Sequence, residues 1–408
     1  MTMTMTMAPS TAPRVRPVPA NFHTTDFDAD PHWRVTASQE VSYEVQLGRD
    51  LLNPDNPTLL KTGAPDGARR RLIVVDTEVD ALFGARLRRY LDARGVTYGI
   101  CRIEAHERVK TMDSALKVVA AMDSFGVSRR REPVIAIGGG VLTDIVGLAT
   151  SLYRRSTPYV RVPTTLIGMV DAGIGAKTGV NFQQHKNRLG TYHPAKATVV
   201  DPAFLATMPA RHVRNGLAEI LKIALVKDAT LFGLLAEHGA HLVNERMQVQ
   251  SPDHGEVAAE VMYRAIHGML QELEPNMWEH QLQRIVDYGH SFSPTIEMSA
   301  LPALLHGESV CIDMALTTVI ARNRGMLTDD ETATIRAVMT GLGLPTWHPV
   351  CSPDLLATAL DDTVRHRDGR QRIPLTAGIG DACFVNDLTP GETAQAQAEL
   401  ARHADREG

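Results

Sequence analysis

The sequence predicts an α/β layered domain followed by a mainly α-helical second half. The run Leu72-Ile73-Val74-Val75 is continuously apolar and ends at Asp76, which is typical of a parallel strand buried on both faces. Stretches with helical periodicity alternate with such runs up to about residue 200, and this βαβα order indicates a layered α/β domain. After Asp201-Pro202, helical periodicity dominates to about residue 345.

The first 37 residues are rich in Thr, Pro and Ala and show little hydrophobic periodicity. This composition predicts a flexible N-terminal arm over residues 1–37. Strands and helices then alternate. The expected strands cover residues 41–47, 71–76, 97–100, 133–137 and 159–163, and the expected helices cover residues 81–93, 111–125 and 141–153.

The change in pattern near residue 205 predicts a boundary between a domain at 38–205 and a helical domain at 206–408. Between residue 163 and that boundary we expect a helix-like stretch after Thr164-Thr165, then a chain loosened by glycines around Lys177. The second half is expected to hold helices at 216–226, 255–273 and 308–324 and short strands at 372–375 and 383–385.

Composition narrows the class of function. The chain has 408 residues, a net charge of -5 and a pI near 6.3, so it carries no electrostatic footprint for nucleic acid or an anionic membrane surface. Its four cysteines form no CxxC pair, which argues against a disulfide framework or a cysteine zinc site. No signal peptide and no long apolar span is recognisable, and we expect a cytoplasmic enzyme.

A triple glycine, Gly138-Gly139-Gly140, follows the expected strand at 133–137 and opens the next helix. Glycines there let backbone N–H groups approach an anion, and the helix N-terminus adds about half a positive charge. A dinucleotide pyrophosphate fits such a turn. The motif is not GxGxxG, however, and a tight turn without any ligand explains it equally well.

Two further groups of residues suggest chemistry without proving it. Glu219 with His290 and His306 offers one carboxylate and two imidazoles, a common catalytic zinc set, but the chain has 16 histidines and the spacing alone is unspecific. The second group consists of cations that could neutralise a phosphate, although each alone is explained as well by a solvated surface charge. Its members are Arg155, Lys177, Lys186 and Arg365.

Considered jointly, the motifs resemble the signature of the dehydroquinate synthase superfamily, the sugar phosphate cyclases. The resemblance covers about residues 40–390, with near-constant spacing from 138 to 222. The motifs are Gly138-Gly139-Gly140-Val141-x-x-Asp144, Val162-Pro163-Thr164-Thr165-Leu166, Asp171-x-x-x-Gly175-x-Lys177-Thr178, Lys186-Asn187, Glu219-x-x-Lys222, Gly289-His290 and Leu305-His306-Gly307-Glu308.

The resemblance implies a Rossmann-like NAD-binding N-terminal domain and a helical metal-binding C-terminal domain, with the active site between them. The implied metal ligands, for zinc or cobalt, are Glu219, His290 and His306. The implied NAD-binding residues are Asp76, Glu107, Lys110, Gly139, Gly140, Val141, Asp144, Thr164, Thr165 and Lys186. The implied catalytic residues are Asp171, Lys177, Lys222, His290 and, less directly matched, Arg264 and Glu274. The implied substrate-binding residues are Arg155, Asp171, Lys177, Asn187, Lys222, Gln283, Asp287, Pro294, Arg365 and His366.

Departures from the family pattern point to the substrate. Dehydroquinate synthases carry an arginine, an asparagine and a second histidine where this chain has Gln283, Asp287 and Pro294. A carboxylate-bearing heptulosonate would lose its bidentate partner and face an added negative charge. We therefore expect a substrate that lacks this carboxylate.

Two local features agree with that expectation: about five extra residues around 275–280, and Arg365-His366-Arg367 in place of a family lysine pair. Both resemble the branch that cyclises sedoheptulose 7-phosphate, the 2-epi-5-epi-valiolone synthases of C7-cyclitol and aminocyclitol pathways. The implied reaction combines transient NAD oxidation, β-elimination of phosphate, reduction and aldol closure. A homodimer is expected from the same resemblance.

Other readings stay open at this level. Cyclases that form 2-epi-valiolone, desmethyl-4-deoxygadusol or 3-dehydroquinate share most of the motifs. Metal-dependent glycerol dehydrogenases share the architecture but need no phosphate cradle, and a catalytically silent sugar-phosphate-binding protein would not need the complete metal set. Steady NADH accumulation with a simple polyol would favour the dehydrogenase, and failure to retain metal would favour the silent binder.

Overall fold

The computed structural model describes residues 23–24, 33–64, 69–183, 185–248 and 252–407. The chain divides into two compact units, Met1–Ser42 and Tyr43–Gly408. In the first unit, β1 (His23–Thr24) pairs antiparallel with β2 (Trp33–Arg34). The arm predicted at 1–37 lies largely outside the described residues. Every element from β3 onward belongs to the second unit.

A six-stranded parallel sheet forms the first part of the second unit, in the order β3-β10-β7-β6-β4-β5. This sheet confirms the predicted α/β class. Its strands are β3 (Glu44–Leu47), β4 (Arg70–Asp76), β5 (Thr97–Ile103), β6 (Val134–Gly138), β7 (Tyr159–Pro163) and β10 (Ala197–Val200).

Helices cover the sheet, and local sequence sets where they begin. Asp76 caps the first long helix, since its side chain accepts a hydrogen bond from Glu78 N at 3.0 Å; Thr111 caps the next by accepting from Ser114 N, as N-cap residues do. The helices in this part are α1 (Thr58–Lys61), α2 (Thr77–Ala93), α3 (Met112–Phe125) and α4 (Gly140–Leu152), with short turns η1 (Glu107–Val109), η2 (Gly168–Ala172) and η3 (Pro202–Thr207).

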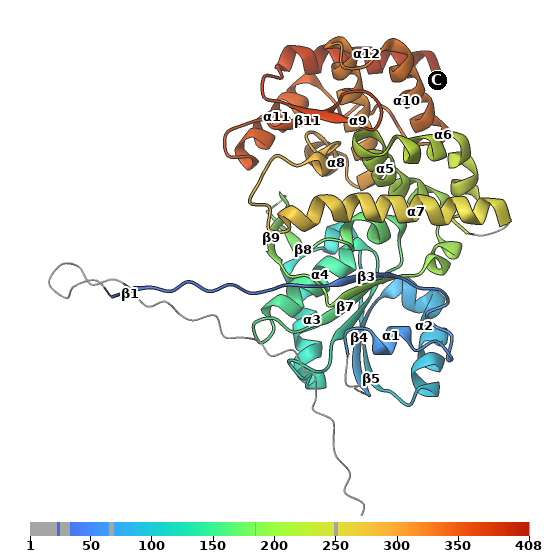
Figure 1. Ribbon diagram of the computed structural model, residues 1–408, viewed down its shortest axis with the longest axis vertical. Coiled ribbons are helices and arrows are strands. Elements are labelled where there is room, and N and C mark those ends of the chain that lie inside the picture. The colour runs from blue at the N-terminus through green and yellow to red at the C-terminus, as the bar shows by residue number, and fades with distance from the viewer. Residues whose placement is uncertain (1–22, 25–32, 65–68, 184, 249–251, 408) are drawn as a thin grey trace, which may run out of the picture. The chain divides into compact units, whose positions relative to one another are not determined.

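Alternate residues of β4 enter different cores, which explains its uninterrupted apolar sequence. Ile73 and Val75 pack in the cluster that contains the buried side chains of α2, whereas Leu72 and Val74 pack with those of α3 and α4. Figure 1 shows these helices on either side of the strands. A strand buried on both faces needs apolar residues at every position.

The chain around Lys177 is a β-hairpin, where we had expected only a glycine-loosened segment. β8 (Lys177–Phe182) pairs antiparallel with β9 (His185–Tyr192), and Gly179 lies opposite Gly190. A Cβ on Gly190 would lie 2.3 Å from the Thr178 carbonyl oxygen. Glycine is therefore required here by the close approach of two strands, and the glycines do not loosen the chain as expected.

The second half is mainly helical, as predicted. Its long helices are α5 (Ala210–Lys227), α6 (Ala229–Asn244), α7 (Pro252–Leu273), α9 (His306–Asn323), α10 (Asp329–Gly341), α11 (Pro353–His366) and α12 (Pro390–Glu407); shorter elements are α8 (Ser293–Ala300), η4 (Glu274–Asn276), η5 (Ile285–Asp287) and the strand pair β11 (Ile373–Thr376) with β12 (Ala382–Val385). In Figure 1, α7 crosses between the sheet and the remaining helices. The boundary predicted near 205 falls between β10 and α5 and stays a prediction, because Tyr43–Gly408 form one compact unit.

Buried residues occupy all of α9 from Gly307 to Ala321, so this helix is the centre of the helical core. None of the helices in the described ranges combines the length and apolar character that a membrane span requires. All four cysteines are free thiols.

Candidate active site

One cavity of about 1150 Å³ is bordered by the carboxyl edge of the sheet, the β8–β9 hairpin and the helical half. It brings together most of the site residues predicted from the sequence. Those that line it are Asp76, Glu107, Lys110, Gly139, Gly140, Val141, Asp144, Thr164, Thr165, Asp171, Lys177, Lys186, Asn187, Lys222, Asp287, His290, Pro294, His306 and His366.

The glycine turn lies at the point of the sheet where a ligand crevice is expected. β4 has β5 on one side and β6 on the other, so the connections leave in opposite directions and open a crevice at the carboxyl ends. α4 begins at Gly140, and among the described side chains none caps it. A Cβ on Gly139 would lie 2.9 Å from Thr165 Cγ2, and one on Gly140 would lie 3.0 Å from Ala172 Cβ. Glycine thus keeps the backbone N–H groups accessible to an anion.

Acidic groups lie beside this turn. Asp76 ends β4, and burial raises the pKa of its carboxyl above the ordinary value. The Glu107 carboxylate accepts a hydrogen bond from Asn181 Nδ2 at 2.8 Å. Carboxylates at this edge can accept hydrogen bonds from ribose hydroxyl groups, so the position of Asp76 fits the adenosine side of a dinucleotide.

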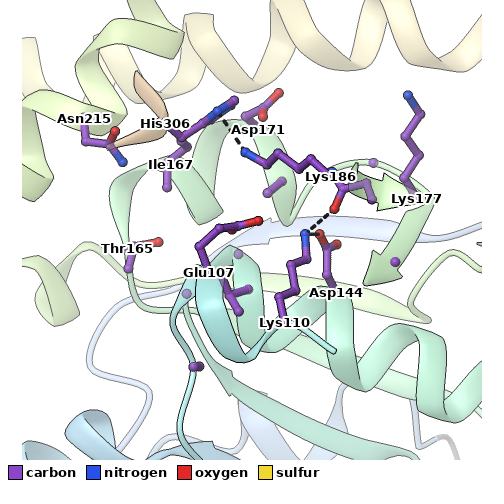
Figure 2. A pocket seen from close by; sticks show the side chains of 18 of the residues that line it. Glu107, Lys110, Asp144, Thr165, Ile167, Asp171, Lys177, Lys186, Asn215 and His306 are labelled. Carbon is purple, nitrogen blue, oxygen red and sulfur yellow. Dashed lines mark hydrogen bonds and ion pairs between the residues drawn. The ribbon is translucent and has the colours of Figure 1, made fainter. Parts of the chain in front are cut away.

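Lys110 connects the helix that follows the glycine turn with the hairpin. Its Nζ donates to Asp144 Oδ2 and to Asn187 Oδ1, both at 2.6 Å (Figure 2). The lysine side chain is only 4% exposed. Asn187 has a backbone φ of +51° and its N–H donates to Asn181 Oδ1 at 2.8 Å, so its backbone and its side chain each have a fixed partner.

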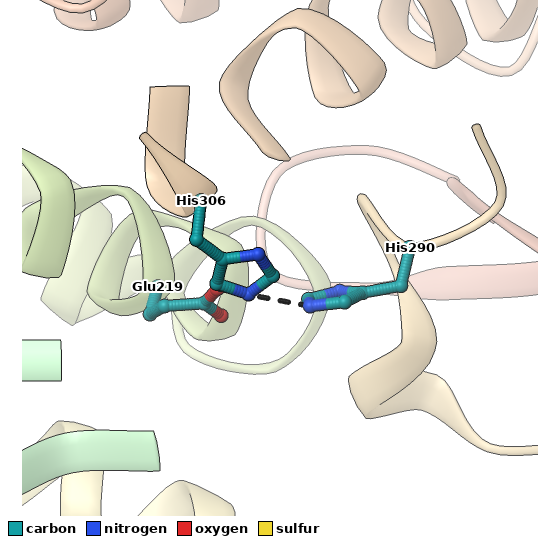
Figure 3. A group of neighbouring side chains, drawn as sticks. All are labelled: Glu219, His290 and His306. Atoms are coloured by element: carbon teal, nitrogen blue, oxygen red, sulfur yellow. Dashed lines mark ion pairs between the residues drawn. The ribbon is translucent and has the colours of Figure 1, made fainter. Parts of the chain in front are cut away.

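Glu219, His290 and His306 come together as a group that could hold a metal ion (Figure 3). Their ligand atoms all lie within 4.8 Å of one another. The His306 Nε2 atom is 3.2 Å and the His290 Nε2 atom 3.7 Å from Glu219 Oε1. Both Glu219 oxygens are buried and, within the described part of the chain, accept no hydrogen bond of normal geometry, although charged partners lie nearby. The Nε2 atoms of two imidazoles and a buried carboxylate form a donor set that suits a zinc ion with an open position.

Electrostatics favour an ionised carboxylate at this centre. Burial alone would raise the pKa of Glu219, but Lys222, His290 and His306 lower it well below its ordinary value. Burial lowers the pKa of His290 to about 4, so this imidazole is neutral near pH 7. Its Nδ1 lies 3.1 Å from the Tyr288 carbonyl oxygen, and a proton there leaves Nε2 free for a metal.

Glu297 orients the third member of the group. Its carboxylate, 3% exposed, accepts from Lys186 Nζ at 2.8 and 2.7 Å and from His306 Nδ1 at 2.8 Å. The Lys186 ammonium also lies 3.2 Å from His306 Nδ1 (Figure 2). We assign the imidazole proton to Nδ1 because the carboxylate can only accept, which directs Nε2 toward Glu219.

Lys222 lies between the metal group and the open cavity. Its Nζ is 2.7 Å from Glu219 Oε2 and 3.5 Å from Asp171 Oδ1. Burial would lower the pKa of this lysine, but Asp171 and Glu219 raise it. The lysine is therefore a buried cation near neutral pH, directly beside the candidate metal position.

A second charged group borders the far side of the cavity. Arg284 Nη1 contacts a Glu279 oxygen and lies 3.5 Å from Asp287 Oδ1. Arg367 Nη2 is 3.9 Å from Asp287 Oδ2. Burial would raise the pKa of Asp287, but Arg284, Arg367 and Lys177 hold it below its ordinary value.

Six predicted residues do not line the cavity. Glu219 is buried behind it, as part of the metal group. Gln283 and Glu274 are exposed. Arg264 pairs instead with Asp228 and Glu260. The remaining two are Arg155, which is exposed in the turn after α4, and Arg365, which pairs with Asp362. Among the described residues, these five lie outside the cavity lining.

Sequence reasoning missed several charged residues of the site, among them Arg284, Glu279 and Glu297. Arg284 and Glu279 line the cavity, and Glu297 joins Lys186 to His306. Arg284 directly follows Gln283 in sequence. The family motif has its arginine at position 283, so a comparison at that position alone does not consider Arg284. Glu297 pairs with a lysine 111 residues away, and spacing along one chain cannot reveal such a pair.

Family comparisons agree with this geometry. The model of the 3-dehydroquinate synthase N-terminal part matches residues 100–215, and that of the C-terminal part matches residues 216–364. The chain belongs to the 3-dehydroquinate synthase family. The family resemblance expected from the sequence motifs is thereby confirmed.

Individual members of this family show close similarity. The chain is 59% identical over 402 residues to a 2-epi-5-epi-valiolone synthase from Streptomyces hygroscopicus subsp. jinggangensis (strain 5008), covering 98% of this chain and 95% of the relative. The structure of ValA, a 2-epi-5-epi-valiolone synthase from that source with NAD+ and Zn2+ bound, matches with a TM-score of 0.86 at 60% identity, covering 91% and 100% of the two chains. A 2-deoxy-scyllo-inosose synthase with carbaglucose-6-phosphate, NAD+ and Co2+ shares the fold, with a TM-score of 0.71 at 20% identity over 93% and 99%.

Proposed function

We propose that the protein is an NAD- and divalent-metal-dependent sugar phosphate cyclase that converts sedoheptulose 7-phosphate to 2-epi-5-epi-valiolone and releases phosphate. One observation carries the proposal: a single cavity joins the glycine turn at the sheet edge to the group Glu219, His290 and His306. The 59% identity to a 2-epi-5-epi-valiolone synthase over 98% of the chain supports the choice of substrate and product.

NAD fits the sheet edge and zinc or cobalt fits the metal group. Two observations support this. Gly139 and Gly140 have no room for a Cβ, so the backbone there stays bare, and the buried Glu219 oxygens accept no normal hydrogen bond from the described residues. When bound, NAD would take a hydride from a ring carbinol and return it, while the metal would polarise the reacting oxygen.

Lys222 and Asp171 supply charge and proton transfer around the substrate. The raised pKa of Lys222 keeps its ammonium charged, so it stabilises negative charge on a substrate oxygen beside the metal position. Asp171 lies 3.5 Å from that ammonium and is 25% exposed, which places its carboxylate where it can hold a proton from a substrate hydroxyl.

Lys177 and Asn187 extend the site toward the hairpin. Lys177 has a side chain that is 59% exposed, and it begins β8, where an ammonium can reach an anionic group in the cavity. Asn187 is fixed by Lys110 at 2.6 Å. An ammonium and an amide of this kind suit the phosphate of a sugar phosphate.

The reaction ends with an intramolecular aldol closure, which requires the two ends of an open-chain sugar to meet. A cavity bordered on opposite sides by the sheet edge and the helical half can hold both ends, and such positioning lowers the entropic part of the barrier.

The same proposal includes zinc or cobalt as metal, a homodimer, a cytoplasmic location and a place in antibiotic biosynthesis. Light scattering of the purified protein tests the homodimer.

The experiment supplies sedoheptulose 7-phosphate and, separately, a carboxylated heptulosonate 7-phosphate to the metal-loaded protein with NAD. We expect inorganic phosphate only from sedoheptulose 7-phosphate, with no net change in NADH absorbance, because the cofactor is regenerated in each turnover. Phosphate only from the carboxylated sugar would refute the proposal, and steady NADH accumulation would favour a dehydrogenase.

A further inference from the structure

Arg284 changes the charge expected at the far side of the cavity. The expectation of a substrate without a carboxylate rested on Gln283, which stands where the family has an arginine, and on the added negative charge of Asp287. Gln283 is exposed, whereas Arg284 lines the cavity with a side chain that is only 14% exposed. A guanidinium is thus present after all, and the loss of one arginine does not by itself exclude a carboxylate.

Glu279 neutralises part of the charge that Arg284 adds. Its Oε1 contacts both Lys177 Nζ and Arg284 Nη1, and its Oε2 accepts from the Tyr192 hydroxyl at 3.1 Å. The carboxylate is 11% exposed and lines the cavity. One protein carboxylate therefore engages two of the cations that a ligand would use.

The loop that carries Glu279 is built to present it. Asn276 holds the loop closed, because its side chain donates to the Gln281 carbonyl at 2.7 Å and accepts from Gln281 N at 3.0 Å. Glu279 has a φ of +53°, a conformation that costs free energy for a residue other than glycine. The ring of Trp278 packs edge-on against Tyr192 with centroids 5.8 Å apart.

We propose that Glu279 is a specificity-determining residue: it supplies an internal anion to Lys177 and Arg284 and so excludes a second anionic group from the ligand. This inference rests on the proposed function, since it concerns the sugar phosphate that the same site takes. Lys177, Arg284 and Glu279 together carry a net charge of +1. This charge suits one anionic substituent such as a phosphate. The other nearby guanidinium, that of Arg367, faces Asp287.

Replacing Glu279 by an uncharged residue raises the net charge of this group to +2. The added positive charge should strengthen the binding of the phosphate in both sugars. Only the carboxylated sugar has a second anionic group whose binding it also strengthens. The ratio of the two dissociation constants therefore isolates the effect on the carboxylate and cancels the common effect.

The test compares Glu279→Gln with Glu272→Gln, a matched control that removes the same charge from an ion pair with Lys227 outside the cavity lining. Dissociation constants of sedoheptulose 7-phosphate and of the carboxylated heptulosonate 7-phosphate are measured by calorimetry on protein loaded with zinc and NADH, because the reduced cofactor cannot accept the hydride and the bound sugar is not turned over. We expect the ratio to shift toward the carboxylated sugar by about tenfold or more in Glu279→Gln, which corresponds to about 1.4 kcal/mol, and not to shift in the control.

Glu279→Asn is the second variant, because asparagine tolerates a positive φ better than other uncharged side chains. It should show the same shift, and it keeps the test decisive if the glutamine variant does not fold. An unchanged ratio in a folded variant, or a shift toward the uncarboxylated sugar, overturns the inference. Failure of the proposed function would be seen separately, as absence of phosphate release from sedoheptulose 7-phosphate by the unaltered protein.

Discussion

Replacing Glu297 by glutamine should weaken zinc binding without touching a metal ligand. The carboxylate is 3% exposed and accepts three hydrogen bonds, two from Lys186 and one from His306. Glutamine has the same shape but only one acceptor oxygen. Its amide NH₂ is itself a donor, so it cannot accept from Lys186 or His306. His306 then loses the partner that fixes its proton on Nδ1, and loss of such a partner lowers metal affinity by about 10–100-fold.

Stability should fall as well, because Lys186 stays buried without its counterion. Removing one partner of a buried ion pair costs about 3–5 kcal/mol, and the raised pKa of Lys186, which burial opposes and Glu297 supports, indicates that the pair is formed. Burial would raise the pKa of Glu297, but Lys186 and His306 hold it far below its ordinary value.

Chelator competition measures zinc affinity, and thermal unfolding of the metal-free protein measures stability. The control is Glu399→Gln, which breaks an ion pair with Arg322 at 2.7 Å elsewhere in the helical half and should lower stability without changing zinc affinity. Zinc affinity in Glu297→Gln equal to that of the unaltered protein would refute the role assigned to this carboxylate.

Three further predictions follow from the same geometry. Gly139→Ala should weaken NAD binding by about tenfold or more, because its Cβ would lie 2.9 Å from Thr165 Cγ2; a fluorescence titration with an unchanged dissociation constant would contradict this. Chelation of the metal should abolish turnover, with recovery on adding zinc or cobalt, and full activity in the stripped protein would speak against the site. Glu392→Gln should destabilise the protein by about 1 kcal/mol near pH 7, since Arg324 lowers the pKa of Glu392 to about 2. A carboxylate whose pKa is lower in the folded than in the unfolded protein stabilises the fold above its unfolded-state pKa, and this stabilisation is lost as the pH falls toward 2. The difference in unfolding temperature between Glu392→Gln and the unaltered protein should therefore vanish near pH 2. A difference that stays constant with pH would contradict the assignment.

The parallel sheet could be predicted because its sequence signal is local. Leu72 and Ile73 enter opposite cores, and a strand that must be apolar at every position is visible in the sequence itself. The glycine turn was visible for the same reason, since it joins one such strand directly to a helix.

The hairpin that begins at Lys177 could not be predicted in this way. Its two strands carry glycines at Gly179 and Gly190, which lie opposite each other, and β9 alternates exposed with partly buried residues. Glycine in a strand weakens the usual composition signal, so we interpreted a paired segment as a loosened one.

The candidate metal group was visible through motifs, whereas its surroundings were not. Glu219, His290 and His306 could be named from short patterns, and their ligand atoms lie within 4.8 Å of one another. Glu297 and Glu279 act through partners brought together only by folding. Conversely, Arg264 matched a family position in sequence but faces Asp228 and Glu260, because side-chain direction on α7 is set by packing.

Product analysis tests the central claim most directly. The protein loaded with zinc and NAD is incubated with sedoheptulose 7-phosphate, and the product is identified by NMR while NADH absorbance is followed. The account predicts 2-epi-5-epi-valiolone, one phosphate released for each sugar consumed, and no net NADH. A different cyclitol stereoisomer, or an open-chain oxidised sugar with stoichiometric NADH, would contradict it.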